Sequence, residues 1–303
     1  MSRLQHSVAG FVLLGLVLTV RATEGGGGAY RNGMEGLMAG DLPAPGQYIE
    51  NYMLYYHADS FPGFLSSRVV GYRMSEQEQY RDILRFINVS SIQVFGGNWA
   101  QQVLVPVGRV ETTFTPTRSA LAPIHERDNG LGNIVVDPFI LGWHSEPFHY
   151  ASGIDIYLPT RQHDSFGQSA VVGRQCWTFE PYVAGTYLNE QGIELSAKFM
   201  YDFNTKNTDD NYLSGQEVHM DFAVAMHLHD WTIGMGGYWY QQTTPDEIFG
   251  HVDESTRGRA LAFGPVVSYQ HWNMRISLAW DREVLVDNRP EGDAVWFQLF
   301  VRL

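Results

Sequence analysis

The sequence has 303 residues, with 20 Lys and Arg residues against 33 Asp and Glu residues and a formal charge of -13. This length suits one large all-β domain, and the acidic balance, unbroken by any basic run, excludes nucleic acid as a partner. Cys176 is the one cysteine, which excludes an intramolecular disulfide framework and any multi-thiolate metal site.

Aromatic residues make up 14 % of the chain, and glycine occurs 31 times. This composition is natural for a membrane barrel, whose Tyr and Trp side chains anchor it at two bilayer interfaces, and also for an aromatic-rich soluble sandwich. Beyond the N-terminus no apolar stretch approaches the roughly 18 residues that a spanning helix requires. A membrane-spanning form of this chain must therefore cross with strands.

The N-terminus has the features of a secretory signal peptide. Arg3 precedes an apolar run from Val8 to Val20, and Val20 and Ala22 occupy the two positions that a signal peptidase reads. Cleavage is expected after Ala22, so residues 1–22 are assigned to the signal peptide. A retained anchor is the alternative, but the apolar run is shorter than the ~20 residues that cross a bilayer.

Residues 23–46 are rich in glycine, contain Pro43 and Pro45 near their end, and show neither helical nor strand periodicity. They are predicted to be irregular, either as a flexible periplasmic leader or as a plug tucked into the mouth of a barrel. The barrel itself is assigned to residues 47–303.

From Tyr48 onward the dominant signal is a period of two, in segments of about ten or more residues separated by turn residues, as in membrane β-strands. Residues 217–229 are the clearest example, and residues 193–204 and 274–281 repeat the pattern. In 217–229 one face carries Val218, Met220, Phe222, Val224, Met226 and Leu228, and the other carries Glu217, His219, Asp221, Ala223, Ala225, His227 and His229. One face suits lipid and the other suits water.

About twelve strands are predicted, with a range of 10 to 14, near residues 47–57, 82–94, 98–113, 131–143, 147–160, 173–188, 192–204, 214–229, 231–243, 257–270, 273–286 and 293–303. Tight connections such as Gly96-Gly97 alternate with longer polar ones such as 205–213 and 244–256. Short periplasmic turns that alternate with long outer loops are typical of an outer-membrane barrel, whereas a sandwich requires no such alternation. The fold predicted is an all-β, transmembrane antiparallel barrel.

Two local signals refine this prediction. Residues 75–78, Ser-Glu-Gln-Glu, resemble a helix capping box and predict a short helix in the first outer loop. The last strand has an apolar residue at every second position from Val295 to Leu303, as an assembled barrel needs in order to leave no unpaired edge in lipid.

Seven stretches resemble the outer-membrane family of transport proteins of the meta-pathway of phenol degradation, a barrel family loosely akin to transporters of hydrophobic compounds. They are GLGNIVVDPF at 130–139, GIDIYLPT at 153–160, WTFEPY at 177–182, YDFN at 201–204, SGQE at 214–217, GRALAFGP at 258–265 and NRPEGD at 288–293. The resemblance covers most of the mature chain. It implies a location in the bacterial outer membrane, contact with its lipid and assembly machinery, and uptake of small hydrophobic or aromatic solutes, with no catalytic residues and no cofactor.

Charged side chains on the predicted interior face are the candidate lumen-lining residues, because the lipid face penalises them by about 2 to 4 kcal/mol at the midplane. They either pair across the lumen and fill it or form a solute-selective lining. If the lumen is open, their surplus of acids favours neutral or cationic solutes. The candidates are Asp137, Asp155, Glu180, Lys198, Asp202, Glu217, His219, Asp221, Arg275 and Asp281.

Other functions are weighed against passive uptake. His219, Asp221, His227 and His229 share one strand face, but a metal needs further ligands from neighbouring strands, so no metal is predicted. A barrel-embedded lipid hydrolase would need a Ser-His pair on the outer surface, yet the sequence has no Gly-x-Ser-x-Gly and these histidines lie on the polar face. A structural barrel without transport remains the main alternative, and the chain is predicted not to be an enzyme.

Overall fold

The computed structural model describes residues 27–63, 71–118, 121–160, 170–207, 209 and 211–303. The signal peptide expected at residues 1–22 lies outside these described residues. Twelve long antiparallel strands form a closed barrel, as the sequence predicts. They are β1 (Gly46–Ser60), β2 (Tyr72–Val94), β3 (Gly97–Pro116), β5 (Val135–Ser145), β6 (Phe148–Tyr157), β7 (Thr178–Leu188), β8 (Ile193–Asn204), β10 (Glu217–Leu228), β11 (Trp231–Gln242), β14 (Arg259–His271), β15 (Met274–Asp287) and β16 (Glu291–Arg302).

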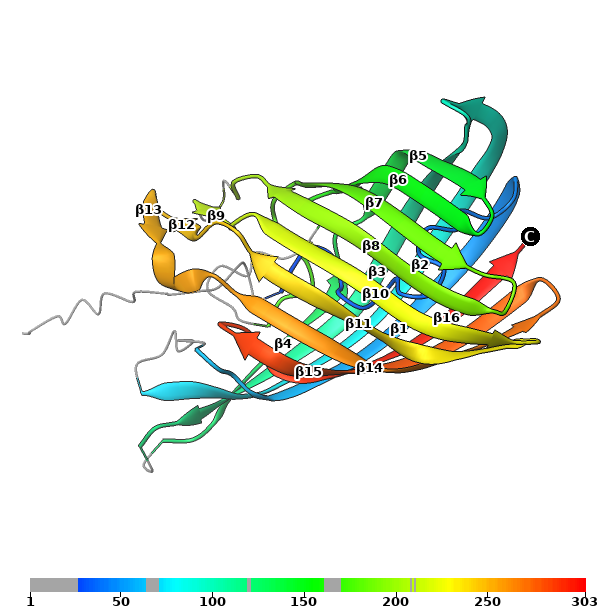
Figure 1. Ribbon diagram of the computed structural model, residues 1–303. Coiled ribbons are helices and arrows are strands. Elements are labelled where there is room, and N and C mark those ends of the chain that lie inside the picture. The colour runs from blue at the N-terminus through cyan, green and yellow to red at the C-terminus, as the bar shows by residue number, and fades with distance from the viewer. Residues whose placement is uncertain (1–26, 64–70, 119–120, 161–169, 208, 210) are drawn as a thin grey trace, which may run out of the picture.

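The barrel closes because β1 pairs with β16 on one side and with β2 on the other. Tyr48 lies opposite Arg302 near one end of the first pair, and Ala58 lies opposite Gly292 near the other. Figure 1 shows the short turns and the C-terminus gathered at one end of the barrel, with the long connections at the opposite end. Short turns of outer-membrane barrels face the periplasm, so we call these the periplasmic end and the outer end.

Four further strands and one short helix lie at the outer end. The strand β4 (Ile124–Leu131) pairs with β3 beyond the point where β5 leaves it. A small sheet joins β9 (Tyr212–Leu213), β12 (Asp246–Ile248) and β13 (His251–Asp253), followed by the 3-10 helix η2 (Glu254–Thr256). The sequence predicted loops in the stretches that hold this small sheet, because strands of two or three residues are too short to display a period of two.

The helix predicted at residues 75–78 is wrong. These residues belong to β2, where Glu76, Gln77 and Glu78 face Thr113, Thr112 and Glu111 of β3 across a regular ladder that follows one bulge. An isolated helical turn is costly to nucleate, whereas the β3 ladder gives each backbone group in this segment a partner. The long-range pairing therefore overrides the local capping pattern.

The exterior face of the barrel wall is apolar, as the alternation of residues along the strands predicts. On β10, Ala223 and Ala225 are buried inside while Val224 between them is 54 % exposed. Aromatic pairs lie toward both ends of this surface, which matches the two interfacial girdles of a barrel in a bilayer. They include Phe148 with Tyr187 and Trp231 with Tyr269 at the periplasmic end, and Tyr55 with Tyr80 and Tyr201 with Phe203 at the outer end. Within the described part of the chain, no helix has the length and apolarity that a transmembrane helix needs.

Candidate functional site

Residues 27–45, which we call the plug, lie inside the barrel and contact strands around its circumference (Figure 1). Asp221 of β10 is the main anchor. Its carboxylate accepts hydrogen bonds from the hydroxyl of Tyr30 at 2.6 Å, from the backbone N–H of Gly33 at 2.9 Å and from the backbone N–H of Glu35 at 3.0 Å. A buried carboxylate with three donors is well satisfied, so the plug has a defined position.

Glu35 is the central acidic group of the plug. Its carboxylate forms ion pairs with Arg85 of β2 and, at 2.7 Å, with Lys198 of β8. Burial raises the pKa of Glu35, but the charges of Arg85 and Lys198 outweigh burial and lower that pKa to about 2. Lys198 also lies 3.5 Å from Asp155, and Arg85 lies 3.2 Å from Glu50. This network ties the plug to opposite sides of the wall.

A second charged cluster lies against the N-terminal part of the plug. The Nε2 atom of His219 lies 3.2 Å from Asp202 and 3.4 Å from Glu180, and its Nδ1 atom lies 3.0 Å from the Asn32 side chain. Acceptor oxygens thus face both ring nitrogens, which suits the doubly protonated ring. Arg174, from the connection before β7, pairs with Glu217 at 2.7 Å and reaches the backbone carbonyl of Gly27 in the plug.

The structure places all ten candidate lumen-lining residues on the interior side of the wall. Asp221 bonds the plug directly, and six others meet in the two charged clusters around it: Asp155, Glu180, Lys198, Asp202, Glu217 and His219. Asp137 instead bridges an interruption of the β5–β6 ladder, accepting from the backbone of Phe139 at 2.9 Å and of Ile154 at 3.1 Å. Arg275 lies over the Phe300 ring at 5.0 Å, and Asp281 is buried beside Gly33.

Two groups of described residues have the geometry of metal ligands. One is the buried group of Glu180, Asp202 and His219, and the other is Asp41, His144 and His149 at the periplasmic end. The histidines that share the β10 face do not converge on one point, because His227 bonds Glu194 at 2.6 Å and lies away from His219. Of the β10 residues that the sequence analysis considered for a metal, only His219 belongs to one of these two groups.

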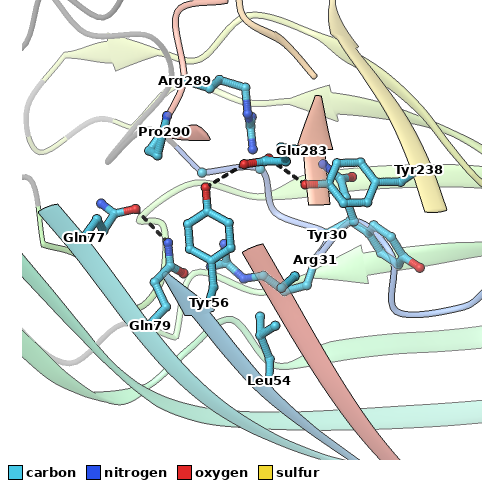
Figure 2. Close-up of a pocket in the computed structure, with 14 residues that line it drawn as sticks. Tyr30, Arg31, Leu54, Tyr56, Gln77, Gln79, Tyr238, Glu283, Arg289 and Pro290 are labelled. Carbon is cyan, nitrogen blue, oxygen red and sulfur yellow. Dashed lines mark hydrogen bonds between the residues drawn. The ribbon is translucent and has the colours of Figure 1, made fainter. Parts of the chain in front are cut away.

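A small cavity lies on the outer side of the plug (Figure 2). It has a volume of about 60 Å³, which is space for a few water molecules. Glu283 accepts from the hydroxyls of Tyr56 at 2.8 Å and Tyr238 at 2.6 Å on one side of it, and Gln79 donates to Gln77 at 2.9 Å on another. The walls therefore combine aromatic rings with groups that donate and accept hydrogen bonds.

Arginines give this outer cavity a positive character. Arg31 of the plug and Arg289 of the β15–β16 connection line it, against the single carboxylate of Glu283. Burial and the neighbouring charges of Arg174 and Arg289 lower the pKa of Arg31 to about 10. The Nε and Nη1 atoms of Arg289 are buried without a hydrogen-bond partner, and its guanidinium lies 3.9 Å from the centre of the Tyr240 ring. Positive side chains thus outnumber negative ones in the lining of this cavity, although acidic residues outnumber basic ones in the whole sequence.

A second cavity, of about 200 Å³, lies on the periplasmic side of the plug. Residues 34–43 of the plug form one wall, and Ile87, Ile140 and Phe300 give the other an apolar surface near the periplasmic end. One cavity thus lies on the outer side of the plug and the other on its periplasmic side.

The sequence alone did not single out the plug residues Tyr30, Arg31 and Glu35 or their wall partner Arg85. Arg85 shares a strand face with Arg81, but Ile83 lies between them and the charged Asp82 lies on the other face, so the pattern of residues 81–85 did not mark an interior position for Arg85. The plug contacts had no signal either, since that segment has no period and its partners lie far away in the sequence.

A closed barrel of twelve strands with an apolar exterior and a polar, plugged interior defines a β-barrel protein of the bacterial outer membrane. The chain belongs to the family described as "Putative MetA-pathway of phenol degradation", whose model matches residues 70–299. A comparison with curated protein sequences finds no match.

Among solved structures, the chain is similar to an outer-membrane channel from Pseudomonas putida F1. The sequences are 16 % identical, the match covers 87 % of this chain and 97 % of the other, and the TM-score is 0.70. A Pseudomonas aeruginosa FadL homologue matches at 9 % identity over 94 % of this chain and 98 % of its own, with a TM-score of 0.39. The first likeness supports the fold, and the second is too distant to add to it.

Proposed function

We propose that the barrel conducts small hydrophobic or aromatic molecules passively across the outer membrane, with the plug as its gate. The observation that carries this proposal is the pair of cavities on opposite sides of the plug, each lined by groups from several strands. The plug residues Tyr30 and Glu35 lie between them, bonded to the buried wall residues Asp221 and Lys198. A solute that enters the outer cavity passes when these plug residues move aside.

The cargo class follows from the outer cavity. Tyr56 and Tyr238 offer ring faces, and Gln77 and Gln79 offer polar groups that suit a hydroxyl. Arg31 and Arg289 supply cations that suit a carboxylate or phenolate, so the lining matches an aromatic ring bearing one polar or anionic substituent. Such a solute enters only when the plug moves and the cavity widens. This selection of neutral or anionic solutes differs from the neutral or cationic solutes expected from the surplus of acidic residues in the lumen.

The test is uptake into proteoliposomes of phenol, benzoate and a sugar of similar size, with the native chain and with Arg289→Gln. We expect phenol and benzoate to enter faster than the sugar, and Arg289→Gln to slow benzoate several-fold while leaving phenol little changed. Arg257→Gln is the matched control, because Arg257 lies at the outer end in an exposed ion pair with Glu254. Equal rates for all three solutes, or a sugar preference, would contradict the proposal.

A structural barrel without transport is the second candidate. The observation in its favour is the pairing of interior charges, since Glu35, Lys198, Asp155 and Arg85 balance one another without any solute. The two candidates differ in planar bilayers. A folded barrel that stays silent even when the plug is detached by mutation supports the structural role and rules out the channel.

A further inference from the structure

Asp41, His144 and His149 form a convergent group at the periplasmic end of the barrel. The two Nδ1 atoms of the histidines lie 2.9 Å apart, and each lies 3.2 Å from the Oδ1 atom of Asp41. His144 and His149 are directly opposite each other on the β5–β6 hairpin, and Asp41 belongs to the plug. The site therefore joins two parts of the chain, the plug and the barrel wall.

The position of Asp41 is set by tight packing on both sides of it. A Cβ atom at Gly40 would lie 2.6 Å from the backbone of Gly185, and the Gly40 N–H donates to the Thr186 hydroxyl at 3.0 Å. On the other side, Leu42 fills the space beside Gly142, where an added Cβ would lie only 2.5 Å from it. The carboxylate is thus held against the hairpin by backbone fit, independently of the histidines.

The distances suit a bound cation. A point about 1 Å above the plane of the three atoms lies about 2.05 Å from each of them, which falls within zinc–nitrogen and zinc–oxygen distances of about 2.0 to 2.2 Å. Wherever an imidazole has its proton on Nε2, its Nδ1 atom presents a lone pair toward the other two atoms of this group. With both rings in the Nε2–H form, one cation accepts the two Nδ1 lone pairs and a lone pair of the Asp41 oxygen at once.

The neighbourhood also allows entry and completion of the coordination shell. The side chains of His144, Asp41 and His149 are 36 %, 30 % and 16 % exposed, so water and ions reach the site from the periplasmic end. Two imidazoles and one carboxylate on one face of an ion leave open positions for water, a donor set typical of first-row transition metals rather than of calcium or magnesium.

We propose that Asp41, His144 and His149 bind a divalent first-row transition-metal ion, with zinc as the representative, and that the ion fastens the plug to the β5–β6 hairpin. Binding adds a bond between the plug and the wall that is separate from the ion pairs of Glu35. The metal site itself does not depend on the proposed transport function. An effect of the metal on solute passage does rest on that function, because holding the plug in place can slow passage only if the plug is the gate.

The first experiment is a calorimetric titration of the purified, metal-stripped barrel in detergent with ZnCl2. We expect one equivalent to bind, the double variant His144→Ala, His149→Ala to lose affinity by about 100-fold or more, and Asp41→Asn to lose less. His271→Ala is the control, because His271 is an exposed histidine at the same end. No binding by the native chain, or binding that both the double variant and the control retain, overturns the site.

The second experiment measures fastening directly. Hydrogen exchange of the amides of residues 34–42 should slow on adding zinc to the native chain and stay unchanged in the double variant. Retained heat-modifiable migration of each variant on a gel shows that its barrel is closed. If zinc binds at this site but the hydrogen exchange of residues 34–42 does not change, the proposal that the ion fastens the plug is wrong. Conductance is recorded separately, so a silent channel contradicts the transport proposal without bearing on the metal site.

Discussion

The ammonium of Lys198 on β8 lies 2.7 Å from the carboxylate of Glu35 in the plug, although 163 positions separate the two residues in the chain. Lys198 is buried and also lies 4.2 Å from the centre of the Tyr182 ring. An ammonium enclosed in this way needs its carboxylate partners, because an unpaired buried charge is costly. The wall thus supplies a fixed cation, and the plug supplies its counter-charge.

Replacing the plug carboxylate should therefore detach the plug. Glu35→Gln leaves Arg85 and Lys198 short of one negative charge, and removal of one partner of a buried ion pair costs about 3 to 5 kcal/mol. We expect more frequent and longer channel openings in planar bilayers than with the native chain. Glu190→Gln, on the exposed β7–β8 turn, is the control and should behave as native. Unchanged openings in Glu35→Gln would show that this network does not hold the plug.

Acid should have the same effect as this substitution. The docked plug holds the pKa of Glu35 at about 2, against an ordinary value of 4.5. A depressed pKa means that the docked plug binds fewer protons than the released plug, so this stabilisation is complete above pH 4.5 and disappears as the pH falls toward 2. The shift corresponds to at most about 3 kcal/mol.

Channel openings recorded across this pH window should rise as the pH falls in the native chain. In Glu35→Gln the same titration should be flatter, because the titrating group is absent. An equally steep rise in both proteins would assign the acid response to another group.

The fit of the plug against the wall offers a steric test. Gly40→Val places atoms where an added Cβ already lies 2.6 Å from the Gly185 backbone, so the periplasmic part of the plug should leave its position while the barrel stays closed. Gly27→Ala is the control, because its Cβ meets only the flexible end of Arg31 at 3.0 Å. Limited proteolysis should cut the plug faster in Gly40→Val alone, and native-like resistance would contradict this account of the packing.

A charge placed on the lipid-facing surface should destabilise the barrel. Val183 lies in the middle of β7 and is 57 % exposed on the apolar exterior, so Val183→Arg should destabilise the barrel by about 2 to 4 kcal/mol. Val252→Arg is the matched control, since Val252 is 60 % exposed on the outer-end strand β13. Urea unfolding of the barrel in lipid vesicles measures both. Equal stability of the two variants would place Val183 outside the bilayer.

The sequence by itself determined the barrel. The alternation along residues 217–229 separates a lipid face from an interior face with no knowledge of neighbours, because side chains of a strand point to opposite sides in turn. The spacing of tight turns and long loops then set the number of strands near twelve. The same local logic placed Asp202, Glu217 and Asp221 on the interior side, where the structure has them.

Only the tertiary structure decided what fills the barrel. Tyr30 and its acceptor Asp221 are 191 positions apart, and Asp41 meets His144 and His149 across about 100 residues. The plug has no period of its own, because its backbone bonds to wall side chains rather than to a regular ladder. Contacts of this kind depend on how a closed wall surrounds a chain segment, and no local pattern of residues encodes that arrangement.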